Sequence, residues 1–228
     1  MTIERKGIRG CVFDAYGTLF DVASASARCG EVLGQKAPRL SSLWREKQLQ
    51  YTWLRAAQGR HADFWQVTGD ALDYAMETLE ISDADLREQL MALYLRLDAF
   101  AEVPDTLRQL KQSGMMMAIL SNGTSSMLLP AVEHAGIGAY LDLVISVEEV
   151  GVYKPHPAVY ARAAKRLQLV PRQICFVSSN AWDAHAASAF GMQVIWCNRY
   201  GQQAERLPGL PDAEIRDLTG VCALLLGG

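Results

Sequence analysis

Polar side chains that could carry out chemistry stand in four short segments of the sequence. They are Asp14 and Thr18, then Ser121 and Asn122, then Lys154, and finally Ser178, Asn180 and Asp183. A carboxylate can act as a nucleophile or accept a proton, and an ammonium can keep a neighbouring carboxylate charged. The chain therefore contains the groups for nucleophilic or acid–base chemistry, provided that the fold brings the segments together.

Each of these residues also has an ordinary structural explanation. Asp14 could cap a turn, and Lys154 could be a solvated loop residue. Asn180 could begin a helix, with Asp183 placed where its charge favours the helix dipole. For Asn180 and Asp183 the structural and functional interpretations carry equal weight, because one residue can both cap and catalyse.

Sequence motifs of several other active sites are absent. The chain has no G-x-G-x-x-G, no Gly-Lys pair of a P-loop, no G-x-S-x-G and no H-E-x-x-H. The four histidines are scattered without metal-ligand spacing. We therefore expect each histidine to be a surface or packing residue.

Short apolar runs precede the polar segments, and helical patterns lie between the runs. We expect strands at residues 8–13, 115–120, 141–146, 173–177 and 193–197, and helices at residues 105–113, 126–135, 158–167 and 181–190. Apolar strands that alternate with helices predict an α/β fold, with a parallel sheet covered on both faces. Ligands of such sheets bind beyond the carboxyl ends of the strands, which selects Asp14, Ser121, Ser178 and their neighbours.

Residues 39–103 contain no proline and predict a helical insert between the first strand and the rest of the sheet. Two apolar stripes with helical spacing are Leu49, Trp53, Ala56 and Ala57, and then Phe64, Val67, Ala71, Tyr74 and Ala75. The core is therefore expected to be discontinuous, with the chain leaving it near residues 19–21 and returning near residues 100–103.

Composition and charge exclude several classes of protein. The chain has 228 residues, 50% hydrophobic and 21% charged, which is enough to form a real core. The formal charge of −3 offers no basic excess for nucleic acid. We expect no membrane span and no signal peptide, because no apolar run is long enough. Five scattered cysteines without a C-x-x-C motif indicate buried thiols in a reducing compartment, so we expect a cytoplasmic protein.

The four polar segments, taken together, resemble the haloacid dehalogenase superfamily from end to end. The matching residues are 13–21 (FDAYGTLFD), 120–123 (LSNG), 153–155 (YKP) and 177–183 (VSSNAWD). The resemblance implies a Rossmann-like core of residues 1–20 and 101–228, with helices on both faces of its parallel sheet. It also implies an inserted helical cap domain of residues 21–100.

Two positions separate this chain from the phosphatases of that superfamily. Phosphatases carry a second Asp two residues after the nucleophile, where this chain has Tyr16, and a Gly-Asp pair, where it has Ser178-Ser179. Magnesium is usually held by carboxylates, so the loss of these groups predicts an enzyme without a metal. The same replacements suit an anionic halo acid as substrate, because additional carboxylates in the site would repel it.

The insert segment 43–55 and residues 178–183 resemble the (S)-2-haloacid dehalogenase subfamily, in which Arg45 matches the arginine of the cap. The resemblance implies that Asp14 attacks C2 of the substrate and displaces halide, and that water hydrolyses the resulting aspartyl ester. C2 is then inverted once, so that (S)-2-haloacids give (R)-2-hydroxyacids. The implied catalytic residues are Asp14, Thr18, Arg45, Lys154, Tyr160, Ser178, Asn180 and Asp183. The implied substrate-binding residues are Ala15, Tyr16, Arg45, Leu49, Phe64, Ser121, Asn122 and Trp182.

The resemblance also implies how the work is divided. Lys154 keeps Asp14 ionised, and Arg45 stabilises the departing halide or meets the substrate carboxylate. Asp183 holds Lys154 and activates water, although its share relative to Lys154 and Asn180 stays open. No cofactor is expected.

Two other functions remain open from the sequence. One is a magnesium-dependent phosphomonoester phosphatase of the same superfamily, and the other is a non-catalytic protein that binds a small carboxylate. The expected partners are a small 2-haloalkanoic acid and water. A homodimer is implied as well, for which Trp44, Trp53 and Trp65 of the insert could offer surface, although such residues are more often simply part of the core.

Overall fold

The computed structural model describes residues 3, 7–22 and 30–227. Within this part of the chain a six-stranded sheet, parallel throughout, has the strand order β3-β2-β1-β4-β5-β6. The strands are β1 (Gly10–Phe13), β2 (Met116–Ser121), β3 (Leu143–Ser146), β4 (Ile174–Ser178), β5 (Gln193–Cys197) and β6 (Ala213–Ile215). The expected parallel α/β sheet is confirmed.

The direction in which successive strands are added to the sheet reverses between β1 and β4. From β1 the chain builds outward through β2 and β3, and it then returns to add β4, β5 and β6 on the other side. β1 is buried along its whole length, as a strand with neighbours on both sides and helices above and below must be. Because a parallel sheet leaves a crevice where its order reverses, the carboxyl ends of β1 and β4 are the place for a ligand.

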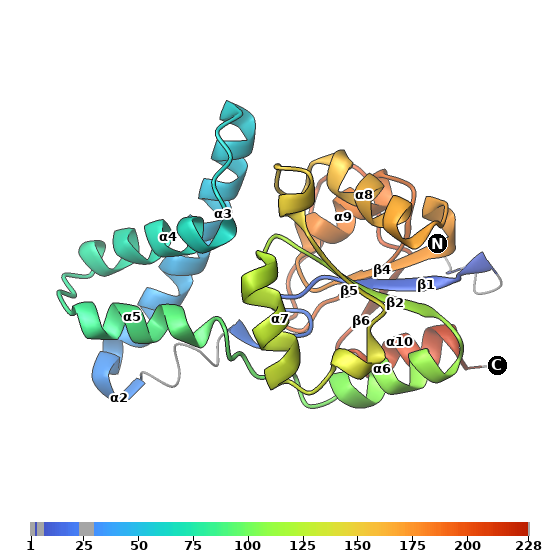
Figure 1. Ribbon diagram of the computed structural model, residues 1–228, viewed down its shortest axis with the longest axis horizontal. Helices are drawn as coiled ribbons and strands as arrows, with labels where there is room; N and C mark the ends of the chain where they lie inside the picture. Colours follow the sequence, from blue (N-terminus) through green and yellow to red (C-terminus); the bar gives the residue numbers. More distant parts are fainter. Residues whose placement is uncertain (1–2, 4–6, 23–29, 228) are drawn as a thin grey trace.

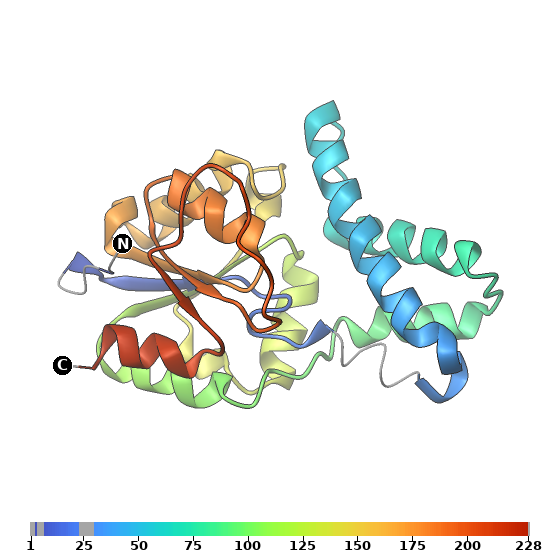
Figure 2. The same cartoon turned by 180° about the vertical axis from the view of Figure 1, so that it is seen from behind.

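Helices cover both faces of the sheet, with α8 and α9 on one face and α6 and α10 on the other (Figures 1 and 2). α7 packs against β3. The bounds are α6 (Val103–Gln112), α7 (Ser125–His134), α8 (Pro157–Leu167), α9 (Ala181–Ala189) and α10 (Thr219–Leu225), with short 3₁₀ turns at Gly138–Tyr140, Val147–Glu149 and Pro171–Gln173.

A group of helices stands apart from the sheet and forms the helical cap (Figure 1). It comprises α2 (Gly30–Leu33), a 3₁₀ turn at Gly34–Lys36, α3 (Ala37–Gln58), α4 (Phe64–Thr78) and α5 (Ala84–Leu93). The two crossings between cap and core lie side by side, since Asp21 N donates to Asp98 O at 2.9 Å and Phe100 N donates to Leu19 O at 3.0 Å. We propose that the limits of the two domains lie at this double crossing, at residues 20/21 and 100/101.

The structure corrects one of the two apolar stripes expected in the insert. In α3 the buried residues are Leu40, Leu43, Trp44, Gln48 and Thr52. Trp53 is 39% exposed, so the stripe through Leu49 and Trp53 is not the face that packs against α4. The prediction was wrong because it followed apolar residues only, whereas the buried face includes two polar side chains that form hydrogen bonds. In α4 the stripe is confirmed except at Tyr74, which is 40% exposed.

Smaller differences concern the ends of elements and the cysteines. Each expected strand lies within two residues of an observed one, but β6 and α10 were missed because both are short, with three and seven residues. Cys11, Cys175 and Cys197 are buried free thiols, as expected, while Cys222 is partly exposed. Cys29 lies outside the described residues. Within the part of the chain that is described, no helix has the length and apolar character to cross a membrane.

Candidate active site

The loop that follows β1 folds into a tight turn that directs two polar side chains toward each other. The backbone N–H groups of Thr18, Leu19 and Phe20 all point at Ala15 O, at 3.2, 2.9 and 3.0 Å. Gly17 has φ of +87°, a left-handed conformation that glycine adopts without strain, and this allows the chain to reverse. As a result the Thr18 hydroxyl comes back over the end of β1 and donates to Asp14 Oδ2 at 3.0 Å.

Asp14 is nearly buried, and three side chains hold its carboxylate, one from its own loop and two from distant segments. Oδ2 accepts from Thr18 and from Asn180 Nδ2, the latter at 2.8 Å. Oδ1 accepts from Lys154 Nζ at 3.2 Å. The Thr18 hydroxyl also accepts from Ser179 N at 2.8 Å, which joins the loop to the end of β4. The first, third and fourth segments of the sequence therefore meet at one carboxylate.

Asp183 forms a second buried centre behind Asp14. Its Oδ2 accepts from Lys154 Nζ at 2.8 Å and from Ser178 Oγ at 3.3 Å. Its Oδ1 accepts from the Tyr160 hydroxyl at 2.6 Å. The Lys154 ammonium, whose side chain is 1% exposed, thus bridges two carboxylates in a dry environment.

This arrangement shifts the protonation equilibria of the buried groups. Burial raises the pKa of Asp183 to about 6; the Lys154 charge opposes this shift and the Asp14 charge reinforces it. Burial alone would lower the pKa of Lys154, but the charges of Asp14 and Asp183 outweigh it, so that the pKa lies above its usual value. Burial next to Asp183 also raises the pKa of Tyr160, which therefore remains a hydrogen-bond donor.

The geometry separates the functional from the structural explanations left open by the sequence. Lys154 is buried and is therefore no solvated loop residue. Asn180 does stand at the N-cap of α9, but its side chain makes no capping bond and donates to Asp14 instead. Asp183 lies in the first turn of α9, with its carboxylate engaged by Lys154, Tyr160 and Ser178. Its side chain therefore serves the site as well as the helix.

The cap supplies Arg45, which lies on α3. Its Nη2 donates to Asn180 Oδ1 at 3.2 Å, and the same Asn180 side chain donates to Asp14. Arg45 lines a cavity of about 740 Å³ between cap and core, together with Tyr16, Leu49, Asn180 and Trp182. The Arg45 cation and the apolar side chains of Leu49 and Trp182 therefore lie in the same cavity as Asn180, which holds Asp14.

Four of the expected substrate-binding residues do not line this cavity. Ala15 and Ser121 are fully buried, and Phe64 stacks against Tyr16 with ring centroids 5.8 Å apart. The Asn122 side chain accepts from Lys154 N at 3.0 Å, so it positions the lysine loop. Their expected contacts with substrate stay predictions.

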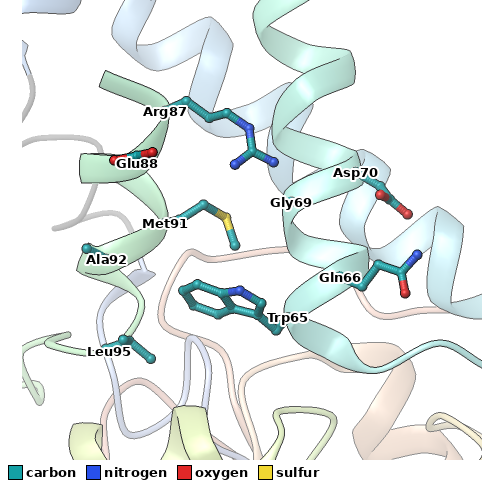
Figure 3. Close-up of a pocket in the computed structure, with 9 residues that line it drawn as sticks. All are labelled: Trp65, Gln66, Gly69, Asp70, Arg87, Glu88, Met91, Ala92 and Leu95. Atoms are coloured by element: carbon teal, nitrogen blue, oxygen red, sulfur yellow. The ribbon is translucent and has the colours of Figure 1, made fainter. Parts of the chain in front are cut away.

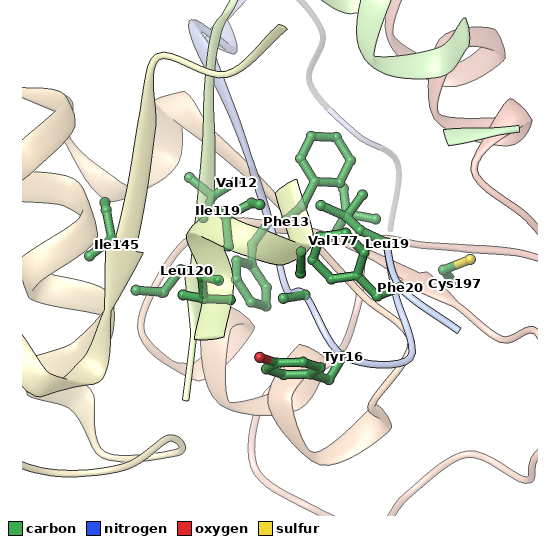
Figure 4. Close-up of a cluster of buried hydrophobic side chains, with 14 of the residues drawn as sticks. Val12, Phe13, Tyr16, Leu19, Phe20, Ile119, Leu120, Ile145, Val177 and Cys197 are labelled. Atoms are coloured by element: carbon green, nitrogen blue, oxygen red, sulfur yellow. The ribbon is translucent and has the colours of Figure 1, made fainter. Parts of the chain in front are cut away.

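Tyr16 lies at the margin of a cluster of buried apolar side chains, among which Phe13, Leu19 and Phe20 surround the end of β1 (Figure 4). Its hydroxyl is buried and has no hydrogen-bond partner among the described residues. Burial raises the pKa of Tyr16 far above its usual value, so the hydroxyl keeps its proton. Tyr16 thus presents an apolar ring and an unused donor at the place where phosphatases carry an acid.

The donor set around Asp14 does not fit a magnesium ion. Both oxygens of Asp14 and both oxygens of Asp183 accept hydrogen bonds from N–H or O–H groups, and an ammonium lies between the two carboxylates. Among the described residues, no group of three or more His, Cys, Asp or Glu side chains could hold a metal ion. No step of the reaction is therefore assigned to a metal.

Sequence reasoning missed residues that support the site from behind. Arg199 donates to Thr18 O at 2.9 Å, pairs with Glu102 at 2.7 Å and lies over the Phe100 ring, so it ties together the loop after β1 and the returning crossing. Gln48 accepts from Arg45 inside the cap. Neither residue is part of a catalytic motif, and only the burial of a polar side chain distinguishes Gln48.

A further hollow of about 340 Å³ lies in the cap between α4 and α5, where the side chains of Trp65, Arg87 and Met91 approach one another (Figure 3). None of the expected site residues lines it. Of the three tryptophans considered for a dimer surface, Trp53 and Trp65 are exposed, but Trp44 is buried and donates to Thr68 O at 2.9 Å. Trp44 is therefore part of the core of the cap, which is the alternative that the sequence left open for it.

Comparison with known proteins places this geometry in a family. A family profile described as haloacid dehalogenase-like hydrolase matches residues 8–191. The chain belongs to this family. Within it, curated relatives that are 42–46% identical over most of the chain are (S)-2-haloacid dehalogenases, so this hydrolase is a member of that group and acts on haloacids.

Curated relatives and solved structures agree on this dehalogenase group. The (S)-2-haloacid dehalogenase of Pseudomonas sp. (strain YL) is 46% identical over 95% of this chain and 94% of its own length. The (S)-2-haloacid dehalogenase 1 of Pseudomonas sp. (strain CBS-3) is 46% identical over 87% of this chain and 88% of its own. The structure of L-2-haloacid dehalogenase from Xanthobacter autotrophicus, with chloropropionic acid covalently bound, superposes with a TM-score of 0.90 at 34% identity and covers 96% of this chain and 99% of its own.

Proposed function

We propose that this dehalogenase hydrolyses (S)-2-haloalkanoic acids to (R)-2-hydroxyacids, with one inversion at C2, through an ester on Asp14. The observation that carries the proposal is the Asp14 carboxylate, which is fixed by Lys154, Thr18 and Asn180, with the cap arginine Arg45 bound to the same Asn180. A carboxylate needs such fixation because it is a weak nucleophile in water, and orientation alone can lower a barrier by several kcal/mol.

The hydrogen bonds on Asp14 distinguish its two oxygens. Oδ2 accepts two bonds, from Thr18 and Asn180, whereas Oδ1 accepts one from Lys154. We assign the attack to Oδ1, because one donor occupies its lone pairs instead of two, which leaves more of this oxygen free to approach C2. Its electron pair forms the C2–O bond while the C2–halogen bond breaks, and the halide leaves with that bond's electrons.

Arg45 stabilises negative charge as the halogen departs. Its guanidinium is held at the cavity by Asn180, and Leu49 and Trp182 supply apolar walls for the halogen and alkyl group. A preorganised cation aimed at developing charge is worth more than the same cation in water, because it pays no reorganisation during the reaction. Ser121 and Asn122 are proposed to hold the substrate carboxylate.

Hydrolysis of the ester completes the cycle. Water attacks the ester carbonyl carbon of Asp14 and passes a proton to the buried Asp183–Lys154 pair, to which Tyr160 and Ser178 are hydrogen-bonded. The carbonyl then reforms, the 2-hydroxyacid leaves with a proton on its new hydroxyl, and Asp14 is again a carboxylate. The net reaction consumes one water and releases one halide and one proton.

The decisive experiment measures chloride release from each enantiomer of 2-chloropropionate with EDTA present, and assigns the product by chiral chromatography. We expect release from the (S) substrate only, with (R)-lactate formed. A single turnover in ¹⁸O-water should place label in Asp14, and Asp14→Asn should be inactive.

Opposite results would refute specific parts of this proposal. Label that enters the new hydroxyl in the first turnover would exclude the ester. Release that requires added Mg²⁺ would contradict the metal-free reaction. No release from either enantiomer would return the phosphatase and the carboxylate-binding protein to consideration. The homodimer and the cytoplasmic location stay predictions.

A further inference from the structure

We propose that Gln48, oriented by Thr68, is the residue that positions Arg45 for the reaction. The inference rests on the function proposed above. It starts from a fully buried amide on the face of α3 that packs against α4, a place where an apolar side chain would be expected. Burial of an amide is unfavourable unless its hydrogen bonds are satisfied, so this side chain has a defined set of partners.

Gln48 joins α3 to the rest of the cap and to Arg45. Gln48 Oε1 accepts from Arg45 Nη1 at 2.7 Å, and the two residues stand three apart on the helix, where side chains meet. Gln48 Nε2 donates to Thr68 Oγ1 at 2.8 Å and lies 3.4 Å from the Tyr94 hydroxyl. The amide therefore has one side toward the arginine and one side toward α4.

Thr68 determines which side of the amide faces Arg45. Its hydroxyl donates its single proton to Phe64 O at 2.6 Å, so toward Gln48 it can only accept. Gln48 must then turn its NH₂ toward Thr68, which leaves its carbonyl oxygen for Arg45. A guanidinium only donates, and a flipped amide would place NH₂ against it. The threonine on α4 thus sets the polarity of the whole chain of hydrogen bonds.

Fixation of Arg45 matters because a long side chain otherwise samples many rotamers. One end of its guanidinium is held by Gln48 within the cap, and the other end donates to Asn180 of the core at 3.2 Å. Asn180 in turn donates to Asp14. The Gln48 bond therefore helps to hold the cation at Asn180, the residue that also contacts the carboxylate proposed to attack the substrate.

The test uses variants that keep size but change hydrogen bonding. Gln48→Met removes the acceptor for Arg45, and we expect kcat/KM for (S)-2-bromopropionate to fall about ten- to hundredfold, the equivalent of one hydrogen bond to a charged group. Thr68→Val should also lower kcat/KM, whereas Thr68→Ser, which keeps the hydroxyl, should stay near wild type. Gln50→Met is the matched control, because Gln50 is exposed on the same helix and accepts only from Lys47 among the described residues.

A double-mutant cycle separates positioning from a merely structural role. If Gln48 acts through Arg45, the variant Arg45→Ala/Gln48→Met has the kcat/KM of Arg45→Ala alone. Losses that multiply in the double variant, or a Gln48→Met enzyme within about twofold of wild type, would overturn the inference. Wild-type enzyme that releases no halide would refute the proposed function instead, so the two failures are distinguishable.

Discussion

The bridge of Lys154 between Asp14 and Asp183 makes a sharp prediction for stability. In Lys154→Met the ammonium is lost while two carboxylates stay at least nine-tenths buried. Removal of one partner from a buried ion pair costs about 3–5 kcal/mol, because the remaining charge is left without compensation. We expect the free energy of unfolding at pH 7 to fall by about this amount, or by slightly more, because two buried carboxylates lose their partner instead of one.

The pH dependence gives this prediction its sign. Lys154 lowers the pKa of Asp183, so its removal raises that pKa further above about 6. When the pKa of a carboxylate is higher in the folded state than in the unfolded state, the folded state binds more protons at a pH between the two values. The free energy of unfolding therefore falls as the pH rises through this range. The Lys154→Met variant should therefore lose less stability at pH 5 than at pH 8.

Urea unfolding at pH 5, 6, 7 and 8 measures both effects. The control is Lys111→Met, since Lys111 pairs with Asp142 on the surface, with both side chains about one-third exposed. That pair should contribute about 0–1 kcal/mol at every pH. If the two variants lose equal stability, and neither loss depends on pH, Lys154 does not compensate the charges of the buried Asp14 and Asp183 carboxylates.

Three further predictions test other parts of the site. Arg45→Ala should lower kcat/KM by about a hundredfold or more, whereas Arg55→Ala, which breaks only a surface pair with an acid on α4, should change it less than about twofold; both are measured by halide release. Single-turnover hydrolysis of the ester should slow at a pH below about 6, because Asp183 takes up a proton there and the ester removes the Asp14 charge that raises the pKa of Asp183 in the free enzyme. A rate that is flat from pH 4 to 8 would exclude Asp183 as proton acceptor. Gly123→Ala should raise KM and cost about 1–3 kcal/mol of stability, because the added Cβ would lie 2.8 Å from the Tyr16 ring, and urea unfolding together with KM would show it.

The sequence was sufficient for the sheet and for most of the residues around Asp14. Apolar strands followed directly by polar residues place Asp14 and Ser178 at the same edge of a parallel sheet, whatever the details of the loops. Lys154, Asn180 and Asp183 then belong to the site through motifs of fixed order. Asp14 and Ser178 could be predicted from chain direction because each stands at the end of a strand. Lys154 lies in the loop between Glu149 and Pro157 and Asp183 lies within α9, so only the motifs indicated that they belong to the site.

The tertiary structure alone decided which partners these residues take. That Asn180 donates to Asp14 instead of capping its helix depends on where the loop after β1 folds back. That Arg45 rests on Gln48 depends on the packing of α3 against α4, which turned a polar residue inward and left Trp53 exposed. The local sequence pattern shows whether a side chain is polar or apolar. A hydrogen bond between segments far apart in the sequence forms only after the helices have packed, so its partners are decided by the tertiary structure.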